Sequence, residues 1–217
     1  MVFDNRGCIE KKLAKMLDDI KSGDNATVGI LVEGGDYNWA LFNTMKNLQN
    51  REMKNGIYVS ARHTTKIMKE MLQRASVSSD DLYFVDVVSV YLSLCGMDDA
   101  EKNTANKNFS YIEHPGNLID ILMIVEKLVK RHETGYFVID SLTHLLLHNN
   151  ANSIKDFSHR LINIMKEYRH TSVWIMTKRA TPDDLIGYIG TMCDIFIDLT
   201  RLEPEHNKES ESNKITL

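Results

Sequence analysis

Short apolar runs alternate with amphipathic stretches along most of this chain. The runs are rich in β-branched residues and end at glycine or polar residues, which is typical of buried strands. Six strands are predicted, over 27–32, 56–60, 82–88, 135–140, 172–177 and 193–199. Between them, apolar residues recur at spacings of three and four, which predicts helices over 39–48, 64–74, 116–131, 153–169 and 182–189. This alternation predicts an α/β fold, a mostly parallel sheet covered by helices on both faces.

The two ends of the chain and one internal stretch follow a different pattern. Apolar residues spaced three and four apart predict an amphipathic helix within 1–22. The polar stretch 91–108 is expected to be an excursion at the sheet edge or a loop. The charged stretch 203–217 has almost no apolar residue and is expected to be a disordered tail. We therefore expect one domain over 1–202.

Composition narrows the class of protein. A chain of 217 residues, 43% hydrophobic and 26% charged, is typical of one globular domain. A formal net charge of −4 argues against a surface built throughout to hold nucleic acid. Cys8, Cys95 and Cys193 have no metal-ligand spacing and are expected to be reduced thiols. With no signal-peptide or membrane-span pattern near the N-terminus, the expected location is the cytoplasm, away from membranes.

The candidate chemistry lies at the ends of three predicted strands. The strand 27–32 leads into Gly34 and a helix, and the strand 135–140 ends in Asp140-Ser141. Between them, the strand 56–60 leads into Arg62-His63. In this order and spacing, residues 26–202 resemble the RecA superfamily, and within it the KaiC-like group common in archaea. The resemblance implies a three-layer RecA-like sandwich with a phosphate-binding loop, then catalytic glutamates, then a metal-associated Asp.

The phosphate-binding loop departs from the pattern of active members. A working loop reads GxxxxGK[ST], because glycines let backbone N–H groups surround phosphates while Lys and Ser/Thr bind charge and Mg²⁺. Trp39, Ala40 and Leu41 stand where the second Gly, the Lys and the Ser/Thr would be, and Asp36 adds a negative charge. Losing the Lys alone removes about 1.5–3 kcal/mol of binding. The sequence therefore predicts a vestigial nucleotide site made of Gly34, Gly35, Asp36, Asn38, Trp39, Ala40, Leu41, Asp140 and Ser141.

The other two motifs are also altered or isolated. Arg62 and His63 stand where active KaiC-like proteins carry paired glutamates, and a guanidinium cannot act as a base at neutral pH. One interpretation is a strand-to-helix turn with Thr64 as the helix N-cap; the other is a grip on an anion or a partner. Asp140 is expected to cap the helix that starts near Leu142, or to hydrogen-bond the turn at 34–38.

Three further features have both a structural and a functional interpretation. Lys178 and Arg179 follow the strand 172–177, where the resemblance implies basic residues that reach a neighbour's phosphates; the alternative is a solvated loop. Tyr37 and Trp39 either belong to a subunit interface or plug the vacated pocket from inside. His144 and His148 have i, i+4 spacing, but with no carboxylate between them we expect exposed helix-face histidines and no metal site.

The leading functional hypothesis is a non-catalytic pseudo-ATPase, a regulatory or scaffolding module that contacts a protein partner or a second copy, in signal transduction or a larger assembly. The alternative is a nucleic-acid-binding RecA-like subunit of a recombination or tRNA-modification assembly. Its basis is a set of basic residues with acidic neighbours, Lys46, Arg51, Lys54, Lys66, Lys69, Arg74, Lys127, Lys130 and Arg131. A third hypothesis is a residual ATP-binding protein. No cofactor is expected, and weak nucleotide or anion binding at the helix N-terminus stays open.

Overall fold

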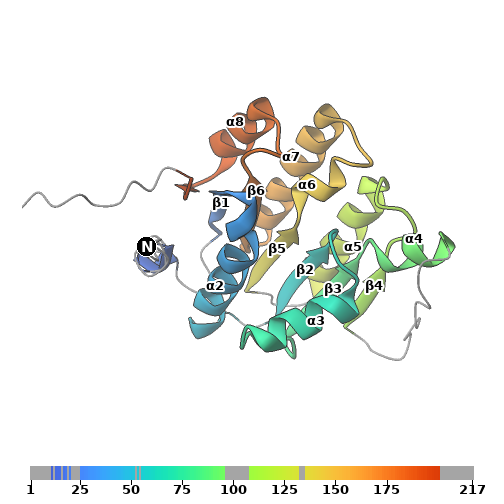
Figure 1. Cartoon of the computed structure of the whole chain (residues 1–217), viewed down its shortest axis with the longest axis horizontal. Coiled ribbons are helices and arrows are strands. Elements are labelled where there is room, and N and C mark those ends of the chain that lie inside the picture. The colour runs from blue at the N-terminus through green and yellow to red at the C-terminus, as the bar shows by residue number, and fades with distance from the viewer. Residues whose placement is uncertain are drawn as a thin grey trace, which may run out of the picture.

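The computed structural model describes residues 25–95, 108–131 and 135–200 except 52 and 54, together with seven residues within 11–20. In this part of the chain, seven strands form one parallel sheet in the order β4-β3-β2-β5-β6-β1-β7 (Figure 1). The strands are β1 Thr27–Val32, β2 Gly56–Ser60, β3 Leu82–Asp86, β4 Phe109–Tyr111, β5 Tyr136–Asp140, β6 Thr171–Thr177 and β7 Ile195–Asp198. The predicted parallel α/β sheet is confirmed.

Helices cover both faces of the sheet (Figure 1). They are the 3-10 turn η1 Gly34–Asp36, then α2 Tyr37–Asn50, α3 Thr65–Arg74, α4 Ser89–Leu94, α5 Leu118–Arg131, α6 Leu142–Leu145, α7 Ala151–Glu167 and α8 Asp183–Met192. One apolar layer joins the sheet to α2, α3 and the helical residues near the N-terminus. A second layer joins the opposite face to α5, α7 and α8. The molecule therefore has the expected three layers.

The strands are apolar on both sides because each side faces a core. Along β2, Ile57 and Val59 belong to the layer under α5 and α7, whereas Tyr58 belongs to the layer under α2 and α3. Side chains alternate between faces along a strand, so a strand buried on both faces has no polar side. This explains why the sequence shows continuous apolar runs rather than alternation.

Some boundaries and one strand differ from the prediction. β4 was missed because it is only three half-buried residues, too short for a period to show. The stretch 91–108 includes the end of helix α4, and its residues 96–107 lie outside the described part, as does the tail 203–217. Of the predicted N-terminal helix, Leu13, Leu17 and Ile20 are buried in the layer under α2.

No helix in the described ranges is long and apolar enough to cross a membrane.

The parallel arrangement brings the candidate residues to one edge. All seven strands end at the same side of the sheet, so the segments after β1, β2 and β5 leave from one edge, with β6 between β5 and β1. β2 and β5 are directly paired, with Ser60 opposite Asp140. The Ala61 amide continues this pairing by donating to the Asp140 carbonyl at 2.5 Å. Arg62 is therefore two residues beyond Ser60, the residue that is paired with Asp140.

Candidate functional site at the carboxyl edge of the sheet

Asp140 is a fully buried carboxylate at the end of β5. The Tyr58 hydroxyl donates a hydrogen bond to its Oδ2 at 2.5 Å. Arg62 Nε lies 3.2 Å from its Oδ1, and this ion pair has an exposed side-chain fraction of 14% at Arg62 and 0% at Asp140. A buried carboxylate needs such compensation, because removing a charge from water costs several kcal/mol. Arg62 Nε and Asp140 Oδ1 are close enough for an ion pair but are not aligned for a hydrogen bond, so Arg62 supplies the opposite charge and Tyr58 the hydrogen bond.

Arg62 is held in place from the other side by the first turn of α2. Its guanidinium carbon lies 4.5 Å from the centre of the Tyr37 ring, in a cation–π contact. Its Nη2 donates to Asn38 Oδ1 at 2.5 Å. Arg62 therefore links the turn after β1 to the end of β5, across the edge at which the segments after β1, β2 and β5 meet.

Two buried tyrosines surround the same carboxylate but differ in their bonding. Burial, followed by the negative charge of Asp140, raises the pKa of both Tyr37 and Tyr58 well above the ordinary value, so both phenols keep their protons. Tyr58 donates a hydrogen bond to Asp140, whereas the buried Tyr37 hydroxyl makes no well-formed hydrogen bond in the described part of the chain, although Asp140 and Ser141 lie close enough to act on its pKa. Tyr37 is only 4% exposed. Its ring fills space beneath Arg62.

The loop positions that would grip phosphate lie in the core instead. Ala40 and Leu41, which replace the family's Lys and Ser/Thr, are fully buried in the layer under α2. Trp39 is half-buried and packs against that layer. Gly34, Gly35 and Asn38 are exposed and Asp36 is half-buried. The burial of Tyr37 supports the interpretation that this side chain fills the vacated phosphate pocket from inside. The half-buried Trp39 fills part of the same layer.

The helix caps follow one prediction and correct another. Thr64 caps α3, because its Oγ1 accepts from the Ile67 amide at 3.4 Å, as predicted. The prediction that Asp140 caps the next helix is wrong. Ser141 is the N-cap of α6, and its Oγ accepts from the His144 amide at 3.3 Å. Asp140 is occupied by Arg62 and Tyr58.

Histidines border the site but do not form the predicted helix face. His144 is half-buried, and its Nδ1 lies 2.7 Å from Ser141 Oγ. His148 lies beyond the end of α6, so the two do not share a helix face. Burial, followed by the charge of Arg62, lowers the pKa of both His144 and His63. Across the residues that the structure describes, no group of three or more His, Cys, Asp or Glu residues could hold a metal ion.

The basic pair after β6 is turned to solvent. Lys178 and Arg179 are both exposed. Arg179 Nε lies 3.6 Å from a Glu33 carboxylate oxygen, and Lys178 Nζ donates to Thr200 Oγ1 at 3.3 Å. Neither of these contacts involves Arg62 or Asp140. The geometry therefore favours the solvated-loop interpretation for this pair.

A second buried carboxylate, Asp86, was missed by the sequence reasoning. Its oxygens accept from Thr65 N and Oγ1, both at 2.7 Å, and from Val88 N, Ser89 N and Ser89 Oγ at 2.6–2.9 Å. These donors begin α3 and α4, so Asp86 ties two helix N-termini to the end of β3. In the sequence, Asp86 could have been noticed as the one acidic residue inside the apolar run 82–88.

Comparisons with known proteins agree with this architecture. No family model matches the sequence, and no curated protein matches it. Among solved structures, a KaiC-like protein, PH0186 from the hyperthermophilic archaeon Pyrococcus horikoshii OT3, is similar with a TM-score of 0.54. The two are 15% identical, over 82% of this chain and 79% of that one. The chain therefore has an α/β RecA-like fold, as the resemblance implied, and at this identity the likeness concerns the fold alone.

Proposed function

We propose that this chain is a non-catalytic RecA/KaiC-like domain that acts through contact with a protein partner or a second copy, as a regulatory or scaffolding module. One observation carries the proposal. The carboxylate that would complete a magnesium site, Asp140, is ion-paired with Arg62 and hydrogen-bonded to Tyr58. A role in signal transduction rests on analogy with other altered members of the fold.

Nucleotide chemistry would require several changes at this edge. A magnesium-bound triphosphate needs a free carboxylate, a cation on its phosphates and a residue that orients the nucleophile. Asp140 is already compensated, and positions 40 and 41 face the core rather than the edge. Arg62 stands where the family's acid would be. These features of the described residues support the absence of phosphoryl transfer.

A contact role is supported by exposed apolar side chains at the β4 end of the same edge. Leu94 on α4 and Leu147 after α6 are each 75% exposed, and Ile119 and Met123 on α5 are 68% and 63% exposed. The segments that carry them meet. The Tyr91 and His148 rings are 5.2 Å apart, and Asn149 Nδ2 donates to the Pro115 carbonyl at 3.3 Å. Exposed apolar side chains on adjoining segments can mark a protein contact.

The nucleic-acid alternative has less support. Four of the nine basic residues make contacts within the described part of the chain. Lys69 Nζ lies 4.4 Å from the centre of the Phe109 ring, Arg51 pairs with Asp18, and Lys130 pairs with Glu126. Arg74 lies 3.9 Å from Glu70. A backbone-binding surface would instead present unpaired cations to phosphates.

Calorimetry with Mg-ATP, ADP, cyclic dinucleotides and a short RNA tests the absence of nucleotide chemistry. We expect no saturable heat for any of the nucleotides at ligand concentrations up to about 1 mM, and no phosphate release above a heat-inactivated control. Asp140→Asn in the same assays separates a trace of contaminating ATPase from activity of this chain. Magnesium-dependent turnover that Asp140→Asn abolishes would contradict the proposal.

Sedimentation equilibrium tests the contact role. In wild-type protein we expect concentration-dependent association, weakened at least about tenfold by Leu94→Ser with Leu147→Ser, because these side chains would otherwise leave water. The matched control is Ile67→Ser on α3, which is also exposed but lies outside the group. Equal effects of the control and the paired substitution would count against this surface.

A further inference from the structure

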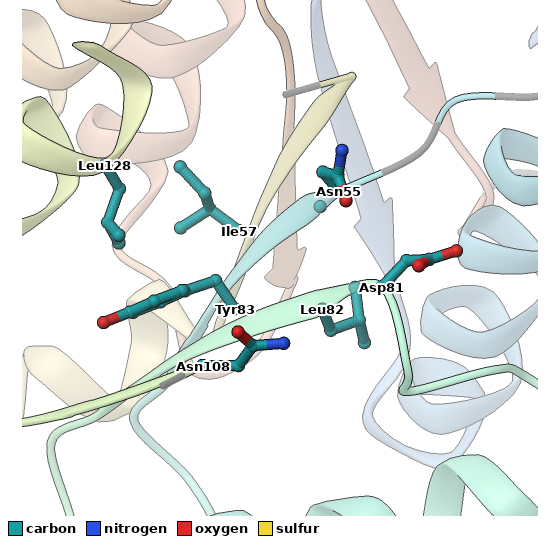
Figure 2. Close-up of a pocket in the computed structure, with 8 residues that line it drawn as sticks. Asn55, Ile57, Asp81, Leu82, Tyr83, Asn108 and Leu128 are labelled. Carbon is teal, nitrogen blue, oxygen red and sulfur yellow. The ribbon is translucent and has the colours of Figure 1, made fainter. Parts of the chain in front are cut away.

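Three aromatic rings meet where α4, the turn before α5 and the segment before α7 come together. The centre of the Tyr91 ring on α4 lies 5.2 Å from the centres of both the His114 and the His148 rings, and the two imidazoles lie 5.5 Å apart. All three pairs are edge to face, an arrangement that aromatic rings prefer. We call these three residues the ring cluster. The small cavity in Figure 2 lies elsewhere, at the amino ends of β2 and β3, and shares no residue with it.

The neutral form of His114 belongs to this arrangement. The Gly116 amide donates to His114 Nδ1 at 2.9 Å. A ring nitrogen that accepts carries no proton, so the His114 ring is neutral with its proton on Nε2. Gly116 is also closely packed, because a Cβ atom there would lie 2.9 Å from His114 Nδ1 and 3.4 Å from the His148 carbonyl oxygen. Protonation of Nδ1 therefore removes the hydrogen bond that holds the ring against this turn.

The surroundings of the two imidazoles disfavour a positive charge. His114 lies just before the N-terminus of α5, and His148 lies just before the N-terminus of α7. The partial positive charge of a helix N-terminus repels a cation. Burial, followed by the charge of His114, lowers the pKa of His148. Two imidazolium rings at this separation would also repel each other, so the cluster favours neutral imidazoles.

The elements that carry the cluster offer little negative charge to offset a proton. α4 (Ser89–Leu94) and the segment 146–150 hold no Asp, Glu, Lys or Arg. In the segment 112–120, Glu113 is exposed, and Asp120 Oδ2 accepts from Asn117 Nδ2 at 2.5 Å. Among the described residues, neither acid is paired with His114 or His148. An added proton on either ring thus has no carboxylate partner there.

The exposed apolar side chains proposed above for partner contact stand on the same three segments. They are Leu94, Leu147, Ile119 and Met123, and we call them the contact surface. We propose that protonation of His114 and His148 opens the ring cluster and disrupts the contact surface, so that association is retained near pH 7.5 and weakened near pH 5.5. This regulation rests on the proposed contact role. Its sign follows from linkage, because an arrangement that needs neutral imidazoles loses stability as they bind protons.

Nuclear Overhauser contacts in dilute full-length protein test the opening. At pH 7.5 we expect contacts between the Tyr91 ring and both imidazoles, and at pH 5.5 we expect these contacts to be lost. The contact between Phe137 and Trp174 in the core, whose ring centres lie 6.1 Å apart, should persist at both pH values. Tyr91 contacts that survive at pH 5.5 would overturn the proposal. So would their loss together with the core contact, because acid would then unfold the whole domain.

Sedimentation equilibrium at the same two pH values tests the regulation. Wild-type association should weaken at least about tenfold between pH 7.5 and 5.5, a difference of about 1.4 kcal/mol. His114→Phe with His148→Phe keeps two rings that cannot titrate and should associate equally at both pH values. If this double variant fails to fold, His148→Phe alone should reduce the pH dependence at least about threefold. His159→Gln, on the exposed surface of α7, is the control and should behave like wild type.

The outcomes separate the regulation from the contact role. Equal pH dependence in wild type and in the phenylalanine variants would overturn the regulation. Wild-type association that does not depend on pH would refute the regulation alone. Association at neither pH would refute the contact role itself, and the regulation with it.

Discussion

Arg62 Nε lies 3.2 Å from Asp140 Oδ1, at a point where the carboxylate has no contact with solvent. The pair joins the turn after β2 to the end of β5, and the Tyr37 ring and Asn38 hold the guanidinium from the far side. Its consequences for stability can be measured without knowing a partner or a ligand.

Replacing Arg62 alone should destabilise the fold more than replacing both members of the pair. Arg62→Leu leaves a buried carboxylate uncompensated, which typically costs about 3–5 kcal/mol of unfolding free energy. Arg62→Leu with Asp140→Leu removes both charges and should recover much of that loss. Urea denaturation of these two variants and of Asp140→Leu, beside wild type, completes the comparison. If the double variant is as unstable as the sum of the two single variants, the residues do not compensate each other.

Two tyrosine substitutions should have unequal effects on stability although both remove one buried hydroxyl. Tyr58→Phe removes a hydrogen bond to the buried Asp140 carboxylate and should cost about 1.5–3 kcal/mol. Tyr37→Phe removes a hydroxyl that makes no well-formed hydrogen bond among the described residues, so it should cost clearly less than Tyr58→Phe. Thermal melts of the two proteins measure this, and a larger loss for Tyr37→Phe would show that its hydroxyl has an important partner.

Restoring the loop residues should lower stability without producing hydrolysis. Ala40→Lys with Leu41→Thr places an ammonium and a hydroxyl at two fully buried positions, while Arg62 still occupies Asp140. Phosphate release should stay at background and the melting temperature should fall. Asn50→Lys, at the exposed end of the same helix, is the control for an added cation and should melt like wild type. A measurable hydrolysis rate in the double variant would mean that the loop needs only these two side chains.

Acid should weaken the fold partly through His63 and His144. Burial and Arg62 lower the pKa of both below 6.5, so near and below that pH the unfolded chain binds more protons than the folded chain. Their contribution is therefore fully present above about pH 6.5 and is lost as the pH falls towards their folded pKa values.

Unfolding free energies measured from pH 7.5 to 5.0 test whether stability falls as the pH falls. His144→Gln with His63→Gln should flatten the profile in that range. His159→Gln, which removes an exposed imidazole on α7, should leave the profile unchanged. A profile that is equally steep in the double variant would assign the acid sensitivity to other groups.

The strands and long helices were predictable because burial on two faces imposes a visible apolar pattern. β1 and β2 have the predicted bounds, and α3 begins after its predicted cap Thr64. β4 lacked that signal, and the end of α4 overlapped the stretch 91–108, whose polar character suggested a loop. Local pattern reports burial and periodicity but carries no information about a partner distant in sequence.

The candidate site was predictable in its position but not in its contacts. The order of the motifs placed residues 34–41, 62 and 140 at one edge, and the parallel sheet brings their segments there. That Arg62 would pair with Asp140, and that Tyr58 would donate to it, depends on the pairing of β2 with β5. Tyr58 had no motif of its own, since a tyrosine inside an apolar strand looks like any other core residue.

The strand order also has a consequence for synthesis of the chain. β1 is made first, yet its only neighbours in the described sheet are β6 and β7, with Thr27 opposite Ser172 and Val28 opposite Ile195. A nascent chain therefore carries an unpaired apolar strand until nearly all of the domain has left the ribosome. Contacts that close such long loops form slowly and leave strand edges open to aggregation meanwhile. Among the described strands, β1 accordingly waits longest during translation for the strands that pair with it.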